Sequence, residues 1–247
     1  ELGDIIEVLF ADSDGTYGYR RIHADLQRAG RPCDPQTVRV LMAERGLVAC
    51  QPRPRGPRTT IPAASGALPD LVNRDFTADE PGLKLVGDIT YIPTWQGWVY
   101  LATVLDCCTK KVVGYAMAEH MRTELVVDAL KMAISNGHTR HGETVFHSDR
   151  GTQYMSAEFA EFTRDAGIVR SVGRTGICYD NAWAESFNAT LKVERVHRTV
   201  YPTRRHAIGD IARYIELRYN QRRLHSALQY RTPNEAEQDW YETNKAA

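Results

Sequence analysis

Hydrophobic positions recur at helical spacing through the first fifty residues. Residues 2–10 place apolar side chains at i, i+3, i+4, i+7 and i+8, which predicts one amphipathic helix. A second helix is predicted over 19–29, and a third begins at Asp34-Pro35, where an acceptor side chain precedes a proline suited to the first helical position. Three short helices with tight connections are typical of a helix-turn-helix module, and a helical cap on a larger domain is the alternative.

A different composition follows. Residues 51–69 hold five of the eleven prolines and three arginines among small polar residues. Such a segment does not build a hydrophobic core, so it predicts an extended linker and a domain boundary.

From residue 85 the pattern changes to that of strands. Three β-type runs joined by short turns predict antiparallel neighbours, and strands then alternate with amphipathic helices. The predicted strands cover residues 85–92, 98–105, 112–118, 144–147 and 168–172, and the predicted helices cover 123–136, 157–166 and 181–194. This order predicts an α/β fold in which a mixed five-stranded sheet carries helices on both faces, after a small all-α segment.

Composition adds a local charge bias to this picture. The 247 residues are 25% charged and 43% hydrophobic, as in globular proteins with a hydrophobic core. The sequence contains no run of 18 apolar residues, so no membrane span is predicted. Basic and acidic residues balance at 31 each, yet residues 186–231 contain ten basic and three acidic residues. A local charge of +7 favours contact with a nucleic-acid backbone, with a solvated helix face as the alternative.

Three carboxylates are the main candidates for chemistry. Asp88 lies in the middle of the first strand, where a buried charge is costly unless it has a partner or a metal. Asp149 directly follows the fourth strand, and Glu185 lies one turn into the last predicted helix. Together they could converge on a pair of hard divalent cations, although Asp88 could instead satisfy a backbone donor. Asp106 also ends a strand, but its turn-like neighbours predict a structural role.

The residues around these carboxylates resemble a known family. Three motifs carry the likeness: Gly87-Asp88-Ile89-Thr90-Tyr91-Ile92, His147-Ser148-Asp149-Arg150-Gly151-Thr152-Gln153-Tyr154 and Asp180-Asn181-Ala182-Trp183-Ala184-Glu185. Asp149 and Glu185 are separated by 35 residues, and Lys192 lies seven residues after Glu185. With the segment around Tyr219-Asn220 and Tyr230, the chain resembles transposases of the insertion-sequence-three family, which belong to the retroviral-integrase-like DDE recombinases.

The resemblance implies a ribonuclease-H-like fold and a polynucleotidyl transferase. Asp88, Asp149 and Glu185 would be catalytic and would hold two Mg²⁺ or Mn²⁺ ions. The reaction would be DNA strand cleavage and 3′-hydroxyl strand transfer at the ends of an insertion element. The partners would be terminal inverted repeats and target DNA, bound by a homo-oligomer in the bacterial cytoplasm and away from any membrane. Family members often need an upstream helix-turn-helix and leucine-zipper segment.

Other residues are expected around this centre. His147 and Asn181 are predicted to lie beside the metal ligands, with core packing as an alternative for His147. Trp95, Trp98 and Trp183 are predicted to pack in the core or the hairpin, with base-stacking platforms as the alternative. Candidate DNA contacts are Lys192, Arg195, Arg20, Arg21, Arg222 and Arg223. The predicted division is a DNA-binding segment over 1–50, a linker over 51–80, a catalytic core over 81–200 and a basic helical extension over 201–247. Two functions stay as alternatives: a nuclease of the same fold without joining activity, and a catalytically silent DNA-binding regulator.

Overall fold

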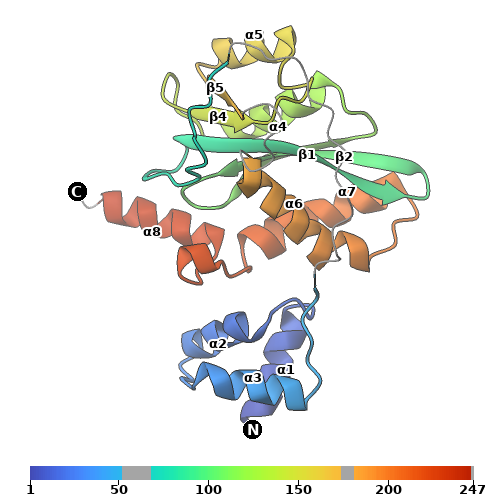
Figure 1. The fold of residues 1–247 in the computed structure, drawn as a ribbon, viewed down its shortest axis with the longest axis vertical. Coiled ribbons are helices and arrows are strands. Elements are labelled where there is room, and N and C mark those ends of the chain that lie inside the picture. Colours follow the sequence, from blue (N-terminus) through green and yellow to red (C-terminus); the bar gives the residue numbers. More distant parts are fainter. Residues whose placement is uncertain (52–67, 174–180, 246–247) are drawn as a thin grey trace.

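A five-stranded mixed sheet forms the centre of the larger part of the molecule (Figure 1). The computed structural model describes residues 1–51, 68–173 and 181–245. The strand order is β3-β2-β1-β4-β5. The strands are β1 (Lys84–Thr94), β2 (Gly97–Asp106), β3 (Val112–Ala118), β4 (Val145–Ser148) and β5 (Val169–Val172). The first three pair antiparallel, and β4 pairs parallel with both β1 and β5.

The unequal lengths of β1 and β4 create an open edge. Their parallel ladder covers only Lys84 to Val86, because β4 has four residues, whereas β1 continues beside β2 as far as Thr94. Asp88 therefore lies just past the point where the neighbouring strand ends. In α/β sheets such a strand end is where ligands bind.

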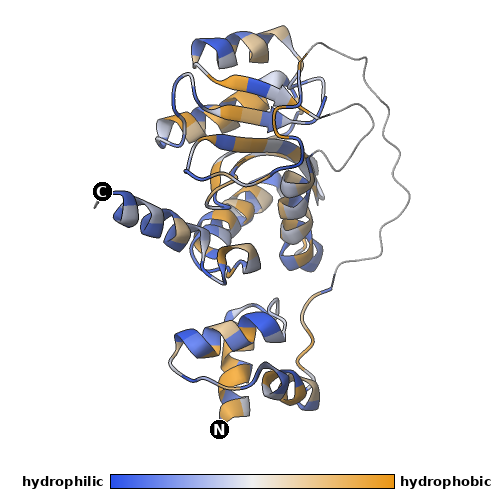
Figure 2. Ribbon diagram, turned by 60° about the vertical axis from the view of Figure 1, so that its left-hand side comes forward, coloured by the Kyte–Doolittle hydropathy of each residue, from blue (hydrophilic) through white to orange (hydrophobic). Residues whose placement is uncertain are grey.

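Helices cover both faces of this sheet (Figures 1 and 2). On one face, α4 (Thr123–Ser135) and α5 (Ala157–Asp165) enclose a core with Leu85 and Phe146. On the other face lie α6 (Ala182–Glu194), α7 (Arg204–Arg213) and the π-helical turn η3 (Tyr214–Asn220). Short 3-10 turns η2 (Val196–Arg198) and η4 (Ser226–Leu228) and the helix α8 (Pro233–Lys245) complete the chain. The predicted C-terminal extension thus shares a core with the sheet, since Ile211 and Ile215 pack in one cluster with Val86.

The N-terminal helical unit consists of α1 (Leu2–Asp12), α2 (Tyr19–Arg28) and α3 (Pro35–Glu44). It has its own core, which contains Ile6, Ile22, Leu26 and Val38. The Asp34 carboxylate caps α3 by accepting from the backbone N–H of residues 36 and 37, as the sequence predicts. Leu224 from the C-terminal segment also packs in this core, so the two parts touch there.

The predicted elements are confirmed, and each predicted boundary agrees with the structure to within two residues. Most of the predicted linker, residues 52–67, and Asp180 lie outside the described residues. Within the described part, no helix is long and apolar enough to cross a membrane. The packing prediction for Trp95 is wrong, because the hairpin ends at residues 94–97 and leaves its indole 77% exposed.

Candidate active site

Asp88 is held on β1 by two hydrogen bonds to its carboxylate. The backbone N–H of Ile89 donates to Oδ1 at 2.8 Å, and the side-chain amide of Asn188 on α6 donates to Oδ2 at 2.9 Å. The side chain is half-buried at the open edge beside the end of β4. Both oxygens are therefore oriented by the protein, one from its own strand and one from the helix above it.

Asp149 lies next to Asp88, one residue beyond β4. Its Oδ1 accepts from the backbone N–H of Gly151 at 2.9 Å, which fixes the carboxylate in the turn that follows the strand. Burial first, and then the charge of Asp149, raise the pKa of Asp88 to about 7. Burial also raises the pKa of Asp149, although the hydrogen bond from Gly151 and the charge of His147 lower it in part. A buried carboxylate whose pKa is raised by a second carboxylate beside it forms a site that favours a cation.

Glu185 projects from the first turn of α6. It also raises the pKa of Asp88, by less than Asp149 does, so it lies within electrostatic range but contributes less. In the three described ranges, no group of three or more Asp, Glu, His or Cys side chains is arranged closely enough to hold a metal ion. The structure therefore brings Asp88 and Asp149 together and places Glu185 at their margin.

The donor atoms at this site suit a hard cation. Asp88 and Asp149 offer carboxylate oxygens, and the buried Oδ1 of Asn188 beside Asp88 has no hydrogen-bond partner. The buried hydroxyl of Tyr154 is also without a partner, and both Asp88 and Asp149 act on its pKa, which burial raises. Oxygen donors are the ligands that Mg²⁺ and Mn²⁺ prefer, so these residues fit such an ion.

Asn188 lies at this site, but the sequence did not single it out. It follows Glu185 by three positions, which places both side chains on neighbouring positions of one helical face. That spacing was the available signal, but an asparagine carries no charge and did not stand out among the carboxylates.

The residues predicted to lie beside the ligands divide into two roles. The side-chain amide of Asn181 donates to the backbone oxygen of Gly87 at 3.0 Å, which ties the start of α6 to the strand residue before Asp88. His147 is fully buried, its Nδ1 is 2.8 Å from the Ser171 hydroxyl, and Asp70 lies 3.9 Å away. His147 thus joins β4 to β5, and its charge lowers the pKa of Asp149.

Two of the predicted DNA contacts form ion pairs within the protein. Arg223 is 6% exposed and pairs with Glu194 through bonds of 2.7, 2.9 and 3.0 Å. Arg195 forms a two-pronged ion pair with Asp210. These arginines join α6 to α7 and to the C-terminal segment, because a buried carboxylate requires a paired cation.

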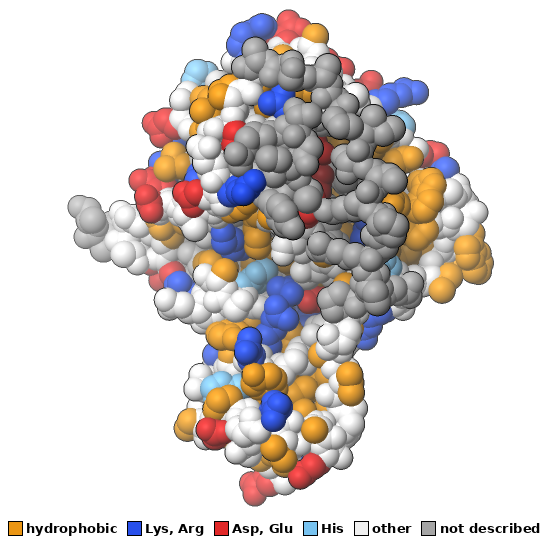
Figure 3. All heavy atoms as spheres, in the orientation of Figure 1, with side chains coloured by type: hydrophobic (Ala, Val, Ile, Leu, Met, Phe, Trp, Pro, Cys, Tyr) orange, Lys and Arg blue, Asp and Glu red, His pale blue; other side chains and the backbone are white. Residues whose placement is uncertain are grey.

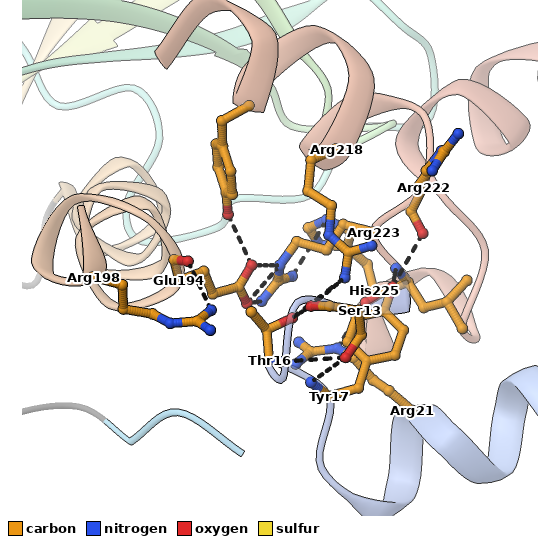
Figure 4. Close-up of polar contacts among 12 residues, drawn as sticks. Ser13, Thr16, Tyr17, Arg21, Glu194, Arg198, Arg218, Arg222, Arg223 and His225 are labelled. Carbon is orange, nitrogen blue, oxygen red and sulfur yellow. Dashed lines mark hydrogen bonds and ion pairs between the residues drawn. The ribbon is translucent and has the colours of Figure 1, made fainter. Parts of the chain in front are cut away.

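The remaining basic candidates lie on or near the surface. Arg20 and Arg222 are exposed, and Lys192 is partly exposed on α6. Arg21 donates to the backbone oxygen of Leu224 at 2.9 Å (Figure 4). A cleft of about 320 Å³ brings Arg20 and Arg21 together between the start of α2 and η4. Its lining consists of Gly18, Tyr19, Arg20, Arg21, Ser226 and Tyr230.

A mixed sheet of this order, with Asp88 on β1 and Asp149 just after β4, is the arrangement of ribonuclease-H-like polynucleotidyl transferases. The comparisons with known proteins agree. The Integrase core domain family matches residues 78–178 and again residues 166–233, and the HTH-like domain family matches residues 1–55. An intasome of simian T-cell lymphotropic virus, solved in complex with the PP2A regulatory subunit B56 gamma, has a similar fold. Its TM-score is 0.52 at 16% identity, over 87% of this chain and 70% of that one.

Two curated relatives narrow the class to a family. The transposase for insertion sequence element IS904 of Lactococcus lactis is 36% identical over 236 residues, which cover 96% of this chain and 93% of that protein. Transposase InsF for insertion sequence IS3A of Escherichia coli is 35% identical over 90% of this chain and 77% of its own length. The chain belongs to the insertion-sequence-three family of transposases with an integrase core domain.

Proposed function

We propose that this transposase cleaves DNA at the ends of its insertion element and joins the resulting 3′-hydroxyl to a second phosphodiester. The observation that carries the proposal is the pair of adjacent carboxylates, Asp88 and Asp149, at the open edge of β1. The chain would act on terminal inverted repeats and target DNA as a homo-oligomer in the bacterial cytoplasm.

Asp88, Asp149 and Glu185 would hold two Mg²⁺ or Mn²⁺ ions. When bound, such ions stabilise the attacking and leaving oxygens of an in-line phosphoryl transfer. The protein itself orients the carboxylates: Asn188 and the N–H of Ile89 each hold one oxygen of Asp88, and Gly151 holds Asp149. Because these bonds are already formed, little reorganisation is needed at the moment of reaction.

The basic residues would hold the DNA backbone around this centre. Lys192 lies on the same helix as Glu185, and the Asp88 carboxylate acts on its pKa, so its ammonium is near the site. The cleft that contains Arg20 and Arg21 would receive phosphates farther along the duplex, together with the exposed Arg222. Neutralised phosphates release counterions, so binding by these residues is expected to weaken with salt.

The test uses a duplex that carries the element's own terminal repeat, with Mg²⁺ or Mn²⁺. We expect 3′-end nicking and joined products from the wild-type chain, and neither from Glu185→Gln or Asp149→Asn. The matched control is Asp128→Asn, because Asp128 is an exposed carboxylate on α4 away from the site, and this variant should retain activity. Cleavage without joining would instead support a nuclease. Binding without chemistry, even when a helix-turn-helix and leucine-zipper segment is added upstream, would support a silent regulator.

A further inference from the structure

Two aromatic rings are exposed together on the β1–β2 hairpin. Tyr91 and Trp98 are 54% and 47% exposed, and their rings meet edge to face with centroids 5.0 Å apart. Figure 3 shows hydrophobic side chains gathered at the right-hand edge of the molecule, over the end of this hairpin. A cluster of solvent-exposed aromatic side chains is typical of a binding surface.

The hairpin that carries these rings is fixed from its other side. The backbone N–H of Trp95 donates to the backbone oxygen of Tyr201 at 3.1 Å, and the N–H of Arg204 donates to the side chain of Gln96 at 3.0 Å. The Arg204 guanidinium also donates to the backbone oxygen of Trp98 at 3.3 Å. The start of α7 therefore braces the hairpin, and the two rings are presented in a set position.

A cation joins this aromatic pair to the carboxylate site. The Lys192 ammonium lies 4.5 Å from the centroid of the Tyr91 ring, in cation–π contact. Burial lowers the pKa of Lys192, while the Asp88 carboxylate raises it, so this one cation serves both places. Among the residues that the structure describes, no carboxylate is within salt-bridge distance of Lys192. Tyr91 lies three residues beyond Asp88, about 10 Å along the strand.

We propose that Tyr91, Trp98 and Lys192 form a strand-binding surface, on which an unpaired DNA base stacks while Lys192 binds its phosphate. The proposal rests on the proposed function, because it places this base within a few nucleotides of the reacting phosphate. Stacking platforms for single strands combine aromatic faces with basic groups in this way. The charge favours DNA over a second copy of the chain, since no described carboxylate pairs with Lys192 and its ammonium suits a phosphate.

The first experiment measures binding of a fluorescein-labelled oligothymidine by anisotropy, in EDTA, so that no chemistry occurs. We expect Tyr91→Leu to weaken binding about tenfold, within the range for one stacked base, and Tyr91→Phe to bind as the wild type does. The matched control is Tyr241→Leu on α8. Tyr241 is 40% exposed and also lies edge to face with a tryptophan, Trp240, but it is not near the carboxylate site.

The second experiment places a single abasic site at each position of the oligonucleotide in turn. The wild-type chain should lose affinity at one position, and Tyr91→Leu should show no such loss, because the ring that reads this base is gone. The proposal is overturned if wild-type chain fails to bind the oligonucleotide or if Tyr91→Leu binds as tightly as wild type. It is also overturned if the substitution changes only the sedimentation of the protein, which would assign the surface to a second copy.

These readouts separate the two proposals. A wild-type chain that shows the abasic-site pattern but gives no joined products would refute the strand-transfer proposal alone. A chain that joins DNA normally but is insensitive to Tyr91→Leu would refute the strand-binding surface alone.

Discussion

The buried ion pair between Glu194 and Arg223 gives a prediction whose size follows from the structure. Both side chains are almost fully enclosed, at 6% and 7% exposure. Arg223 donates to both carboxylate oxygens, and the Tyr214 hydroxyl donates to Oε2 at 2.8 Å (Figure 4). In Arg223→Met, Glu194 would remain buried with its main counter-charge removed. Removal of one partner of a buried pair costs about 3–5 kcal/mol, so we expect a loss of that order in the free energy of unfolding.

The assay is equilibrium unfolding in urea at pH 7.5, followed by circular dichroism. The matched control is Arg231→Met, which breaks an ion pair with Asp239 of the same 2.7 Å length between side chains that are 42% and 49% exposed. Surface pairs contribute about 0–1 kcal/mol, so this control should lose little. The double variant Glu194→Met/Arg223→Met should recover much of the loss, because no charge then stays buried.

The loss of stability in Arg223→Met should also depend on pH. Burial would raise the pKa of Glu194, but Arg223, with smaller contributions from Tyr214 and Arg21, lowers this pKa below the ordinary value of 4.5. A lowered carboxylate pKa stabilises the fold above the unfolded-state value, and this contribution is lost as the pH falls through the folded-state pKa. The difference between wild type and Arg223→Met should therefore narrow below about pH 4.5. An Arg223→Met variant that loses no more stability than Arg231→Met at pH 7.5 would refute the argument.

Three further predictions concern the active site and the DNA surface. Because the pKa of Asp88 is raised to about 7, the stabilising contribution of this carboxyl group is present below pH 3.8 and is lost as the pH rises through 7. Asp88→Asn should therefore raise the melting temperature in EDTA more at pH 8 than at pH 5, and equal shifts would contradict this. Asn188→Leu removes a hydrogen bond that lowers the pKa of Asp88, so the affinity for Mn²⁺ at pH 7 should weaken about tenfold. Calorimetry would measure this affinity, and an unchanged value would show that Asn188 does not contribute to metal binding. Arg20→Gln and Arg222→Gln should each reduce the slope of log affinity for duplex DNA against log salt by about 1, and an unchanged slope would show that neither touches a phosphate.

Local signals in the sequence were sufficient for the elements. Asp34-Pro35 marks the start of α3 because a capping carboxylate and a fixed proline φ act within one turn. The alternation of helix and strand patterns indicated the mixed sheet, and the residues around Asp88, Asp149 and Glu185 indicated the family. Asp106 was predicted to be structural, and it accepts from the backbone N–H of Gly82, Cys108 and Thr109.

Only the tertiary structure decided which partners each charged or aromatic side chain contacts and how far it is exposed. Arg222 and Arg223 are neighbours with the same charge, yet the first is exposed and the second is buried on Glu194, which is 29 residues away in sequence. The exposure of Trp95 and the bond from Asn188 to Asp88, across 100 residues, were decided in the same way. Helix and strand preferences act over a few residues, whereas the burial and pairing of a side chain depend on segments that folding brings together from distant parts of the chain. The sequence by itself therefore determined the elements and the family and singled out the acidic residues as candidates, and the fold decided which arginines are exposed.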